Sequence, residues 1–312
     1  MSILKSNKPR QFLKGMAFLF VLLIAAACSP QQPATQPPDT STPPTEVLPT
    51  ATPDTSAAKG LYDEGMALLE KGDLDGAIKK FDQLVQEQPN NSLAYTQRGI
   101  AKTQKGDTDG ALADFNKAIE LEPKNFFALN SRGSLFAGQE KLDEALADFT
   151  AAIEANPQYP KAYVNRANIF AFKGDFEKAL EDYNKALELD PNDPAIYFNR
   201  GAAYGEMQQF EKAAEDFSKY VDMAPNDPAG YFNRAMAYGE LGDIDSALFN
   251  INKAIELDPA NPQLYMLRGM VYAQKRLTDN AIADFKKVLE LTNDEDLRTK
   301  ATEWLQLLGV NP

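Results

Sequence analysis

The sequence predicts an all-α protein, an α-α superhelix (solenoid) in which seven helix–turn–helix units of 34 residues stack in a row. The main observation is a period of 34 residues that repeats seven times between residues 58 and 295 without an insertion or deletion. A fixed period of this size is typical of proteins in which each unit covers the apolar face of the next. The expected repeats are 58–91, 92–125, 126–159, 160–193, 194–227, 228–261 and 262–295.

Three columns of apolar or small residues indicate how each unit packs. The eighth place holds a small residue: Gly65, Gly99, Gly133, Ala167, Gly201, Ala235 and Gly269. The twentieth place is alanine in every repeat, and the twenty-fourth is large and apolar: Phe81, Phe115, Phe149, Tyr183, Phe217, Ile251 and Phe285. Small residues let two antiparallel helices approach closely, and the large side chain then fills the space beside them.

The ends of the helices are also marked. In the fifth repeat Asp193 is expected to cap the first helix, with Pro194 as its first residue, because the missing N–H of proline costs nothing there. Pro225 closes the second helix, since proline cannot continue one. Apolar residues at helical spacing in residues 297–308 predict a last helix, so residues 296–312 are expected to cap the open end of the stack.

These columns resemble the tetratricopeptide repeat (TPR), and the resemblance covers about three quarters of the chain. A closing proline completes the pattern in six repeats, and Asn293 replaces it in the seventh. The family resemblance implies a superhelix of stacked hairpins whose concave inner surface binds other proteins.

The N-terminal residues carry a separate signal. Four basic residues lie within the first fourteen, and an apolar run, 16–27, follows them. This is the pattern of a secretory signal peptide, and the run is too short to span a membrane comfortably. Three alanines stand directly before Cys28, the only cysteine of the chain. This arrangement resembles the lipobox of bacterial lipoproteins, with Ala25 where leucine is usual.

The resemblance implies cleavage after residue 27 and attachment of lipid, with palmitate as an acyl group, at Cys28. The alternatives are an ordinary cleaved signal peptide or an uncleaved anchor. Residues 28–57 then form a proline- and threonine-rich disordered tether, which contains no lysine or arginine. The expected location is the bacterial cell envelope, with the protein anchored by lipid on the non-cytoplasmic side of a membrane.

Composition argues against catalysis, metal binding and nucleic-acid binding. The chain has no histidine, so the commonest general base and metal ligand is missing. Lipidation would leave no cysteine for nucleophilic catalysis or zinc binding. The net charge of −13 makes nucleic acid a poor partner. We therefore expect no catalytic residues, no metal site and no cofactor.

A column of arginines faces a column of acidic residues. The expected pairs join the seventh and twenty-third places of one repeat: Arg98 with Asp114, Arg132 with Asp148, Arg166 with Asp182, Arg200 with Asp216, and Arg268 with Asp284. The first repeat reverses both signs, with Glu64 and Lys80, and the sixth has Arg234 with the neutral Asn250. A matched reversal predicts structural ion pairs between the two helices of a hairpin. Capture of an anionic ligand by the arginines is the alternative.

The resemblance also implies which residues line the inner surface. In the family these are mainly six places of each first helix, and in repeats two to seven of this chain they hold only three charged residues: Lys161, Glu206 and Glu240. We expect a neutral groove lined by amide, aromatic and methionine side chains. The predicted peptide-binding residues are Asn165, Asn168, Asn199, Asn233, Phe198, Phe232, Met236, Met266 and Met270. A ladder of asparagines suits an extended peptide backbone, because each amide is both a donor and an acceptor. The alternative is that asparagine before arginine is only a repeat consensus.

One known family function is not expected. Relatives that grip the C-terminal carboxylate of cytosolic chaperones use basic groups on this inner surface. Here Val164, Ala229 and Asn233 stand where those groups would be. The function that the sequence favours is a membrane-anchored scaffold that binds an extended segment of one or more partner proteins. The alternative is an assembly or stabilising factor of an envelope machine, such as a pilus, a secretion system or outer-membrane protein biogenesis.

Overall fold

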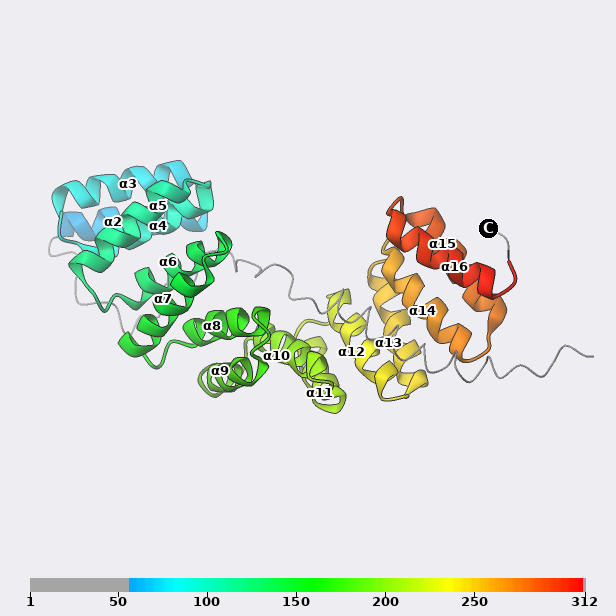
Figure 1. Cartoon of the computed structure of the whole chain (residues 1–312). Helices are drawn as coiled ribbons and strands as arrows, with labels where there is room; N and C mark the ends of the chain where they lie inside the picture. Colours follow the sequence, from blue (N-terminus) through cyan, green and yellow to red (C-terminus); the bar gives the residue numbers. More distant parts are fainter. Residues whose placement is uncertain (1–55, 311–312) are drawn as a thin grey trace, which may run out of the picture. The chain divides into compact units, whose positions relative to one another are not determined.

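The computed structural model describes residues 56–310, and all of the regular structure in that range is α-helical (Figure 1). The predicted signal peptide, Cys28 and nearly all of the predicted tether lie outside the described residues. The helices fall into two compact units, 56–192 and 193–310. The predicted all-α fold built of stacked helix pairs is confirmed.

The N-terminal unit consists of four helical hairpins. Its helices are α2 (Ser56–Glu70), α3 (Leu74–Glu87), α4 (Ser92–Lys105), α5 (Thr108–Leu121), α6 (Phe126–Gly138), α7 (Leu142–Ala155), α8 (Pro160–Phe172) and α9 (Phe176–Leu189). Each even-numbered helix packs along the next helix, and each hairpin packs on its neighbour through contacts such as α3 with α4.

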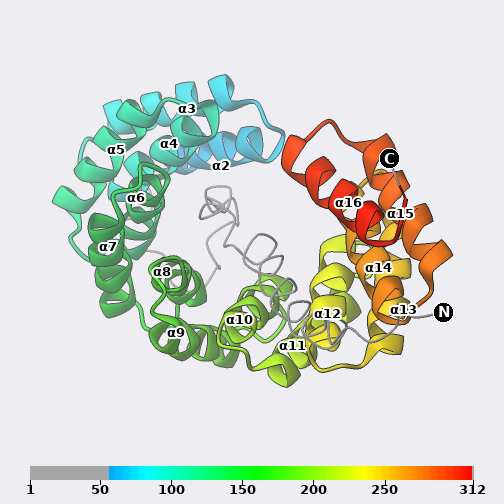
Figure 2. The same cartoon turned by 45° about the vertical axis from the view of Figure 1, so that its right-hand side comes forward.

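The C-terminal unit consists of three hairpins and a final helix. Its helices are α10 (Pro194–Glu206), α11 (Phe210–Met223), α12 (Pro228–Glu240), α13 (Ile244–Leu257), α14 (Pro262–Gln274), α15 (Thr278–Leu291) and α16 (Glu295–Leu307). The predicted last helix is confirmed, and it packs beside α15 in both views (Figure 1, Figure 2). Trp304 stacks on the ring of Phe285 at a centroid distance of 5.5 Å, so α16 covers the apolar end of the last hairpin.

The interior of each hairpin follows the predicted columns. The alanines of the twentieth place and the large side chains of the twenty-fourth are buried, as in the pair Ala111 and Phe115. Phe115 lies so close to Gly99 that a Cβ atom on this glycine would sit 2.7 Å from its Cε1. The small residue of the first helix therefore makes room for the ring of the second.

The helix ends also agree with the sequence. Asp193 accepts a hydrogen bond from the backbone N–H of Ala195 at 2.9 Å, and Pro194 is the first residue of α10, as predicted. Between the two helices of a hairpin, one residue has a left-handed backbone. It is Gly72, Gly106, Gly174 and Gly242 in four hairpins, but Glu140, Gln208 and Arg276 in the others.

In each unit some first helices of successive hairpins touch one another. α2 contacts α4, α4 contacts α6, and α6 contacts α8; in the C-terminal unit α10 contacts α12. Within residues 56–310 the second helices of successive hairpins show no contact of comparable extent. Because one side of each stack is packed more closely, each unit curves with its first helices on the inner side. We call the surface formed by these first helices the inner surface of that unit.

Candidate functional site

Most of the predicted peptide-binding asparagines form hydrogen bonds within the repeat stack. Asn165 on α8 donates a hydrogen bond from Nδ2 to Oδ1 of Asn130 on α6, at 2.9 Å. Asn168 accepts a hydrogen bond from the hydroxyl of Tyr183 at 2.6 Å. Asn233 is only 4% exposed and donates to the carbonyl oxygen of Ala229, one turn earlier in α12. These bonds hold Asn168 and Asn233 to their own hairpin or helix, and at Asn233, which precedes an arginine, they favour the consensus alternative.

Asn165 and Asn199 remain the partly exposed members at the sixth place of their repeats. Asn165 lies in the N-terminal unit and Asn199 in the C-terminal unit. Both side chains are partly exposed on first helices of their units.

The predicted methionine part of the groove is wrong. Met236 is 2% exposed, and Met266 and Met270 are fully buried in the main core cluster of the C-terminal unit. Phe232 belongs to the same cluster and is buried. These side chains cannot contact a partner, because the other helices of the C-terminal unit cover them. The family positions that line the inner surface elsewhere are used here for packing between repeats.

Phe198 is partly buried and packs on the second helix of its own hairpin. Its ring lies 5.7 Å from that of Phe217 and 4.9 Å from that of Tyr220, measured between centroids. It therefore serves mainly as a packing residue of the α10–α11 hairpin.

The arginine column forms bidentate ion pairs within hairpins. In five repeats Nε and Nη2 of the arginine each donate to one carboxylate oxygen of the aspartate, at 2.5–2.9 Å. The pairs are Arg98–Asp114, Arg132–Asp148, Arg166–Asp182, Arg200–Asp216 and Arg268–Asp284. Each aspartate is buried, so the guanidinium compensates a charge that would otherwise be costly to bury.

The third contact of these arginines was not predicted. Nη1 reaches back to the twenty-fifth place of the preceding repeat, where Arg98 meets Asp82 at 2.8 Å and Arg132 meets Asn116 at 2.7 Å. The same contact joins Arg166 to Thr150 and Arg268 to Asn252. In the sequence, the column of short polar residues at the twenty-fifth place could have indicated this contact. Each of these arginines therefore fastens one hairpin to the hairpin before it.

Five repeats carry a tyrosine at the fourth place, and these side chains lie beside the arginines: Tyr95, Tyr163, Tyr197, Tyr231 and Tyr265. The guanidinium carbons of Arg98, Arg166 and Arg268 stand 5.3–6.0 Å from the ring centroids of Tyr95, Tyr163 and Tyr265. Each tyrosine ring stabilises one face of the arginine guanidinium, and the aspartate carboxylate binds the same guanidinium in its plane.

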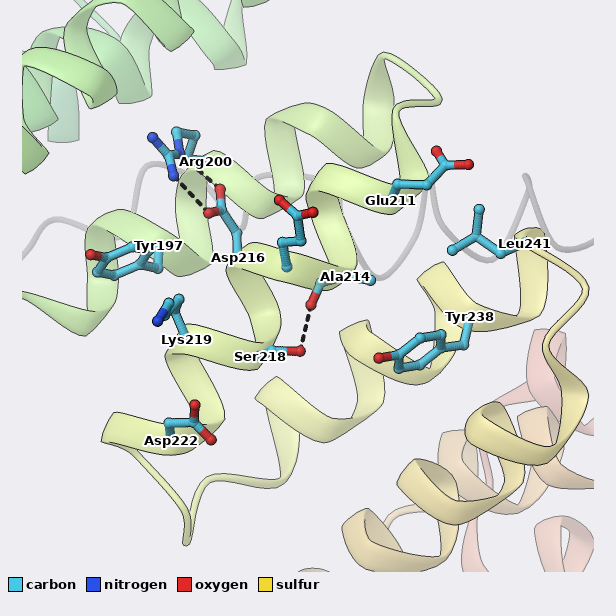
Figure 3. Close-up of a pocket in the computed structure, with 11 residues that line it drawn as sticks. Tyr197, Arg200, Glu211, Ala214, Asp216, Ser218, Lys219, Asp222, Tyr238 and Leu241 are labelled. Carbon is cyan, nitrogen blue, oxygen red and sulfur yellow. Dashed lines mark hydrogen bonds and ion pairs between the residues drawn. The ribbon is translucent and has the colours of Figure 1, made fainter.

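A shallow cavity of about 650 Å³ opens on the C-terminal unit (Figure 3). It lies between α11 and the end of α12, with Arg200 and Asp216 at one side and Tyr238 and Leu241 at the other. Exposed side chains of α11, including Lys219, complete its wall. A second cavity of about 340 Å³ adjoins it on the α12–α13 hairpin and shares Tyr238; its other lining residues are Arg234, Asp245, Ser246, Phe249 and Asn250.

Two carboxylates end first helices in the C-terminal unit. Desolvation raises the pKa of Glu206 and the pKa of Glu240 above the ordinary value of 4.5. Oε1 of Glu240 is buried and has no hydrogen-bond partner among residues 56–310. The negative end of the helix dipole disfavours a carboxylate at this position as well.

The described residues contain no group of three or more acidic, histidine or cysteine side chains that could hold a metal ion. Between residues 56 and 310, no helix has the length and apolar character needed to span a bilayer.

Family models for the tetratricopeptide repeat match the chain along almost its whole repeat region. They cover residues 62–126, 96–160, 149–181, 194–227, 228–261 and 262–295, and a model described as a TPR repeat covers 167–208. Together the matches run from residue 62 to residue 295.

Solved structures of tetratricopeptide repeat proteins share the fold. A TPR protein from Parabacteroides merdae ATCC 43184 aligns with a TM-score of 0.55 and 22% identity, over 82% of this chain and 100% of that one. The C-terminal part of a TPR repeat-containing protein from Cytophaga hutchinsonii aligns with a TM-score of 0.60 and 20% identity, over 77% and 98%. YrrB aligns with a TM-score of 0.54 and 23% identity, over 61% and 97%. No curated protein matches the sequence.

Proposed function

Because this chain belongs to the tetratricopeptide repeat family, we propose that it is a protein-interaction scaffold that binds an extended segment of a partner protein along an inner surface. The observation that carries this proposal is the contact between first helices of successive hairpins within each unit, as between α6 and α8 or between α10 and α12. The similar protein YrrB is described as a TPR protein with an unusual peptide-binding site. That description supports a peptide ligand here.

Asn165 and Asn199 are the groove residues that we retain. Both are partly exposed on first helices, and an amide side chain can pair with the N–H and the C=O of an extended backbone. Such pairing recognises the extended conformation of the partner segment rather than its amino-acid sequence. Specificity for a sequence would come from neighbouring side chains. The work of the protein would be recruitment and positioning rather than catalysis.

The anchor belongs to the same proposal and rests on the sequence of residues 1–57. Lipidation of Cys28 would hold the repeats on the non-cytoplasmic side of a bacterial membrane, and the tether would give them reach. Metabolic labelling with a palmitate analogue tests this directly. We expect labelling and membrane fractionation of the wild type, and the loss of both in Cys28→Ser.

The binding function is tested by capture of partners on the full chain in mild detergent. We compare the wild type with an Asn165→Ala, Asn199→Ala variant, and with Asn233→Ala as a matched control. A partner lost by the double variant and kept by the control would support the groove, and a peptide array of that partner would then locate the bound segment. Equal capture by all three proteins would contradict it, provided circular dichroism shows that each is folded. A stoichiometric complex with a membrane assembly would favour the assembly-factor alternative.

A further inference from the structure

The sixth repeat differs from the others at two adjacent places of its second helix. At the twenty-third place Asn250 replaces the aspartate that five other repeats use to hold the arginine. At the twenty-second place it has Phe249, where the other repeats have short or charged residues: Lys79, Ala113, Ala147, Glu181, Glu215 and Ala283. Phe249 is 66% exposed, the most exposed large apolar side chain among the described residues. Both changes lie at the same small cavity.

The first change leaves the charge of Arg234 uncompensated. Its Nε donates to Oδ1 of Asn250 at 2.7 Å, and its Nη1 lies 3.4 Å from the hydroxyl of Ser218. In the part of the chain that the structure describes, no carboxylate lies within ion-pair distance of Arg234, and Nη2 has no acceptor. Nη2 is the atom that grips the aspartate in the five complete pairs.

The aromatic ring beside Arg234 is also placed differently. In four repeats the ring at the eleventh place lies over the arginine, as for Phe136 over Arg132 and Tyr272 over Arg268. Among residues 56–310, the only ring recorded over Arg234 is that of Tyr231. Tyr238, at the eleventh place, instead lines both cavities, and in Figure 3 its ring points across the larger one toward the side of Ser218.

The two cavities near Arg234 also carry other charged groups, and Glu211, Glu215, Lys219 and Asp222 line the larger one. Asp245, in the smaller cavity, forms an ion pair with Lys275 at 2.6 Å from Oδ1 to Nζ. In the larger cavity Arg200 and Asp216 neutralise each other. The local surface combines Arg234, which has no carboxylate partner among residues 56–310, with an exposed phenyl ring, the ring of Tyr238 and the half-exposed Leu241.

We propose that the surface formed by Arg234, Tyr238 and Phe249 on the α12–α13 hairpin binds a partner polypeptide through a carboxylate flanked by an apolar side chain. The carboxylate supplies the negative charge that Asn250 lacks and accepts from Nη2 of Arg234, while Asn250 keeps its bond to Nε. The apolar side chain covers Phe249. A guanidinium that is half-buried gives a stronger charge-assisted hydrogen bond than one in open water. This site is separate from Asn165 and Asn199, so it adds a second docking surface to the proposed scaffold.

The carboxylate can be an aspartate side chain or a chain terminus, and the probes distinguish the two. The first pair of labelled peptides carries one aspartate between two phenylalanines, or asparagine in its place. The second pair ends in phenylalanine with a free carboxylate, or with an amide. Binding to the full chain in mild detergent is followed by fluorescence anisotropy. We expect at least one carboxylate peptide to bind about tenfold more tightly than its neutral partner.

The decisive variant is Asn250→Asp, which supplies the carboxylate from within. This substitution should stabilise the fold and abolish the difference in affinity between the carboxylate peptide and its neutral partner. If Asn250 had only a structural role, the substitution would not affect peptide binding. Phe249→Ser should weaken binding about tenfold without loss of the fold, because the ring is exposed. Phe172→Ser, at another exposed phenylalanine, is the matched control and should bind as the wild type does.

Three results would overturn the proposal. One is equal binding of the charged and neutral peptides, or no saturable binding of either carboxylate peptide at about millimolar concentration. Another is unchanged binding by folded Asn250→Asp. The third is a dimer of the full chain that Phe249→Ser dissociates, which would assign the surface to a second copy of the chain. The Asn165→Ala, Asn199→Ala variant should bind these peptides normally, so failure here is distinct from failure of the inner-surface proposal.

Discussion

Arg234 and Asn250 are joined by a single hydrogen bond, 2.7 Å from Nε to Oδ1, at the two places where five other hairpins hold an arginine and an aspartate by two bonds. The amide of Asn250 is satisfied on its other side, since Nδ2 donates to the carbonyl oxygen of Ser246. The side chain of Asn250 is thus hydrogen-bonded on both sides, whereas Arg234 has no carboxylate partner among residues 56–310. Stability and binding should respond in opposite directions when the charge is restored.

Asn250→Asp should raise the free energy of unfolding by about 1–2 kcal/mol, because the hydrogen bonds gained involve two charged groups in a half-buried site. The converse substitution, Asp216→Asn, should lower it by a similar amount, since it leaves Arg200 with a neutral partner. Urea denaturation followed by circular dichroism measures both. A loss of stability in Asn250→Asp would mean that the bond to Ser246 contributes more than the restored charge.

Burial should decide how much each ion pair contributes. Asp182 is buried against Arg166, so Asp182→Ala should cost about 3 kcal/mol, because it leaves a guanidinium without its partner in a poorly solvated site. Glu64 occupies the arginine place of the first repeat and pairs with Lys80, but its side chain is 60% exposed. Glu64→Ala should therefore cost less than about 0.5 kcal/mol. Similar losses in these two variants would contradict the role assigned to burial.

Much of the architecture could be predicted from the sequence, because repetition reveals which residues face each other. The reversed signs of Glu64 and Lys80 indicated a partnership, and the two side chains do form an ion pair. The period itself fixed the number of hairpins. Local helix signals alone would not have placed Arg166 opposite Asp182, which is sixteen residues away.

The inner surface was harder to predict, because position in a repeat does not determine exposure. Met266 and Met270 occupy places that line the groove in relatives, yet the neighbouring helices bury them completely. The sequence shows that Arg234 faces the neutral Asn250, but it does not reveal a binding site there. Only the contacts of the five complete pairs show what Nη2 of Arg234 lacks, and a sequence gives no such contacts.

Glu240 should make stability depend on pH with a definite sign. Its folded pKa is raised above 4.5, so the folded state binds the proton more tightly than the unfolded chain does. The carboxylate is therefore unfavourable at pH 7, and this penalty disappears as the pH falls through the folded pKa toward 4.5. Glu240→Gln should raise the free energy of unfolding at pH 7 by up to about 1 kcal/mol, and by almost nothing near pH 4.

The free energy of unfolding is measured for variant and wild type at both pH values. Taking the difference between the two proteins at each pH cancels the titration of all other groups. Asp245→Asn serves as the control, because this exposed carboxylate is paired with Lys275. An equal gain for Glu240→Gln at both pH values would show that its charge is not the cause.

The left-handed turn position predicts another pair of opposite effects. Gln208 has φ of 58° between α10 and α11, while Gly242 has φ of 76° at the same place of the next hairpin. A side chain is strained in this region and glycine is not. Gln208→Gly should stabilise the protein by about 0.5–1 kcal/mol, and Gly242→Ala should destabilise it by about 1 kcal/mol. Thermal unfolding of both variants checks the signs, and a stabilising Gly242→Ala would rule out strain as the cause.

The close approach of helices in a hairpin can be tested at two glycines with different surroundings. A Cβ atom on Gly99 would lie 2.7 Å from Cε1 of Phe115, whereas on Gly201 its nearest neighbours, in Asp216 and Phe217, would be 3.1 Å away. Alanine raises helix propensity by about 1 kcal/mol at either site, but overpacking costs about 1–3 kcal/mol where a ring cannot move. Gly99→Ala should therefore destabilise the protein by about 1 kcal/mol, while Gly201→Ala should be nearly neutral. If both variants gained stability in urea, the rings would have room to shift, and the small residues of the eighth place would not be setting the distance between the helices.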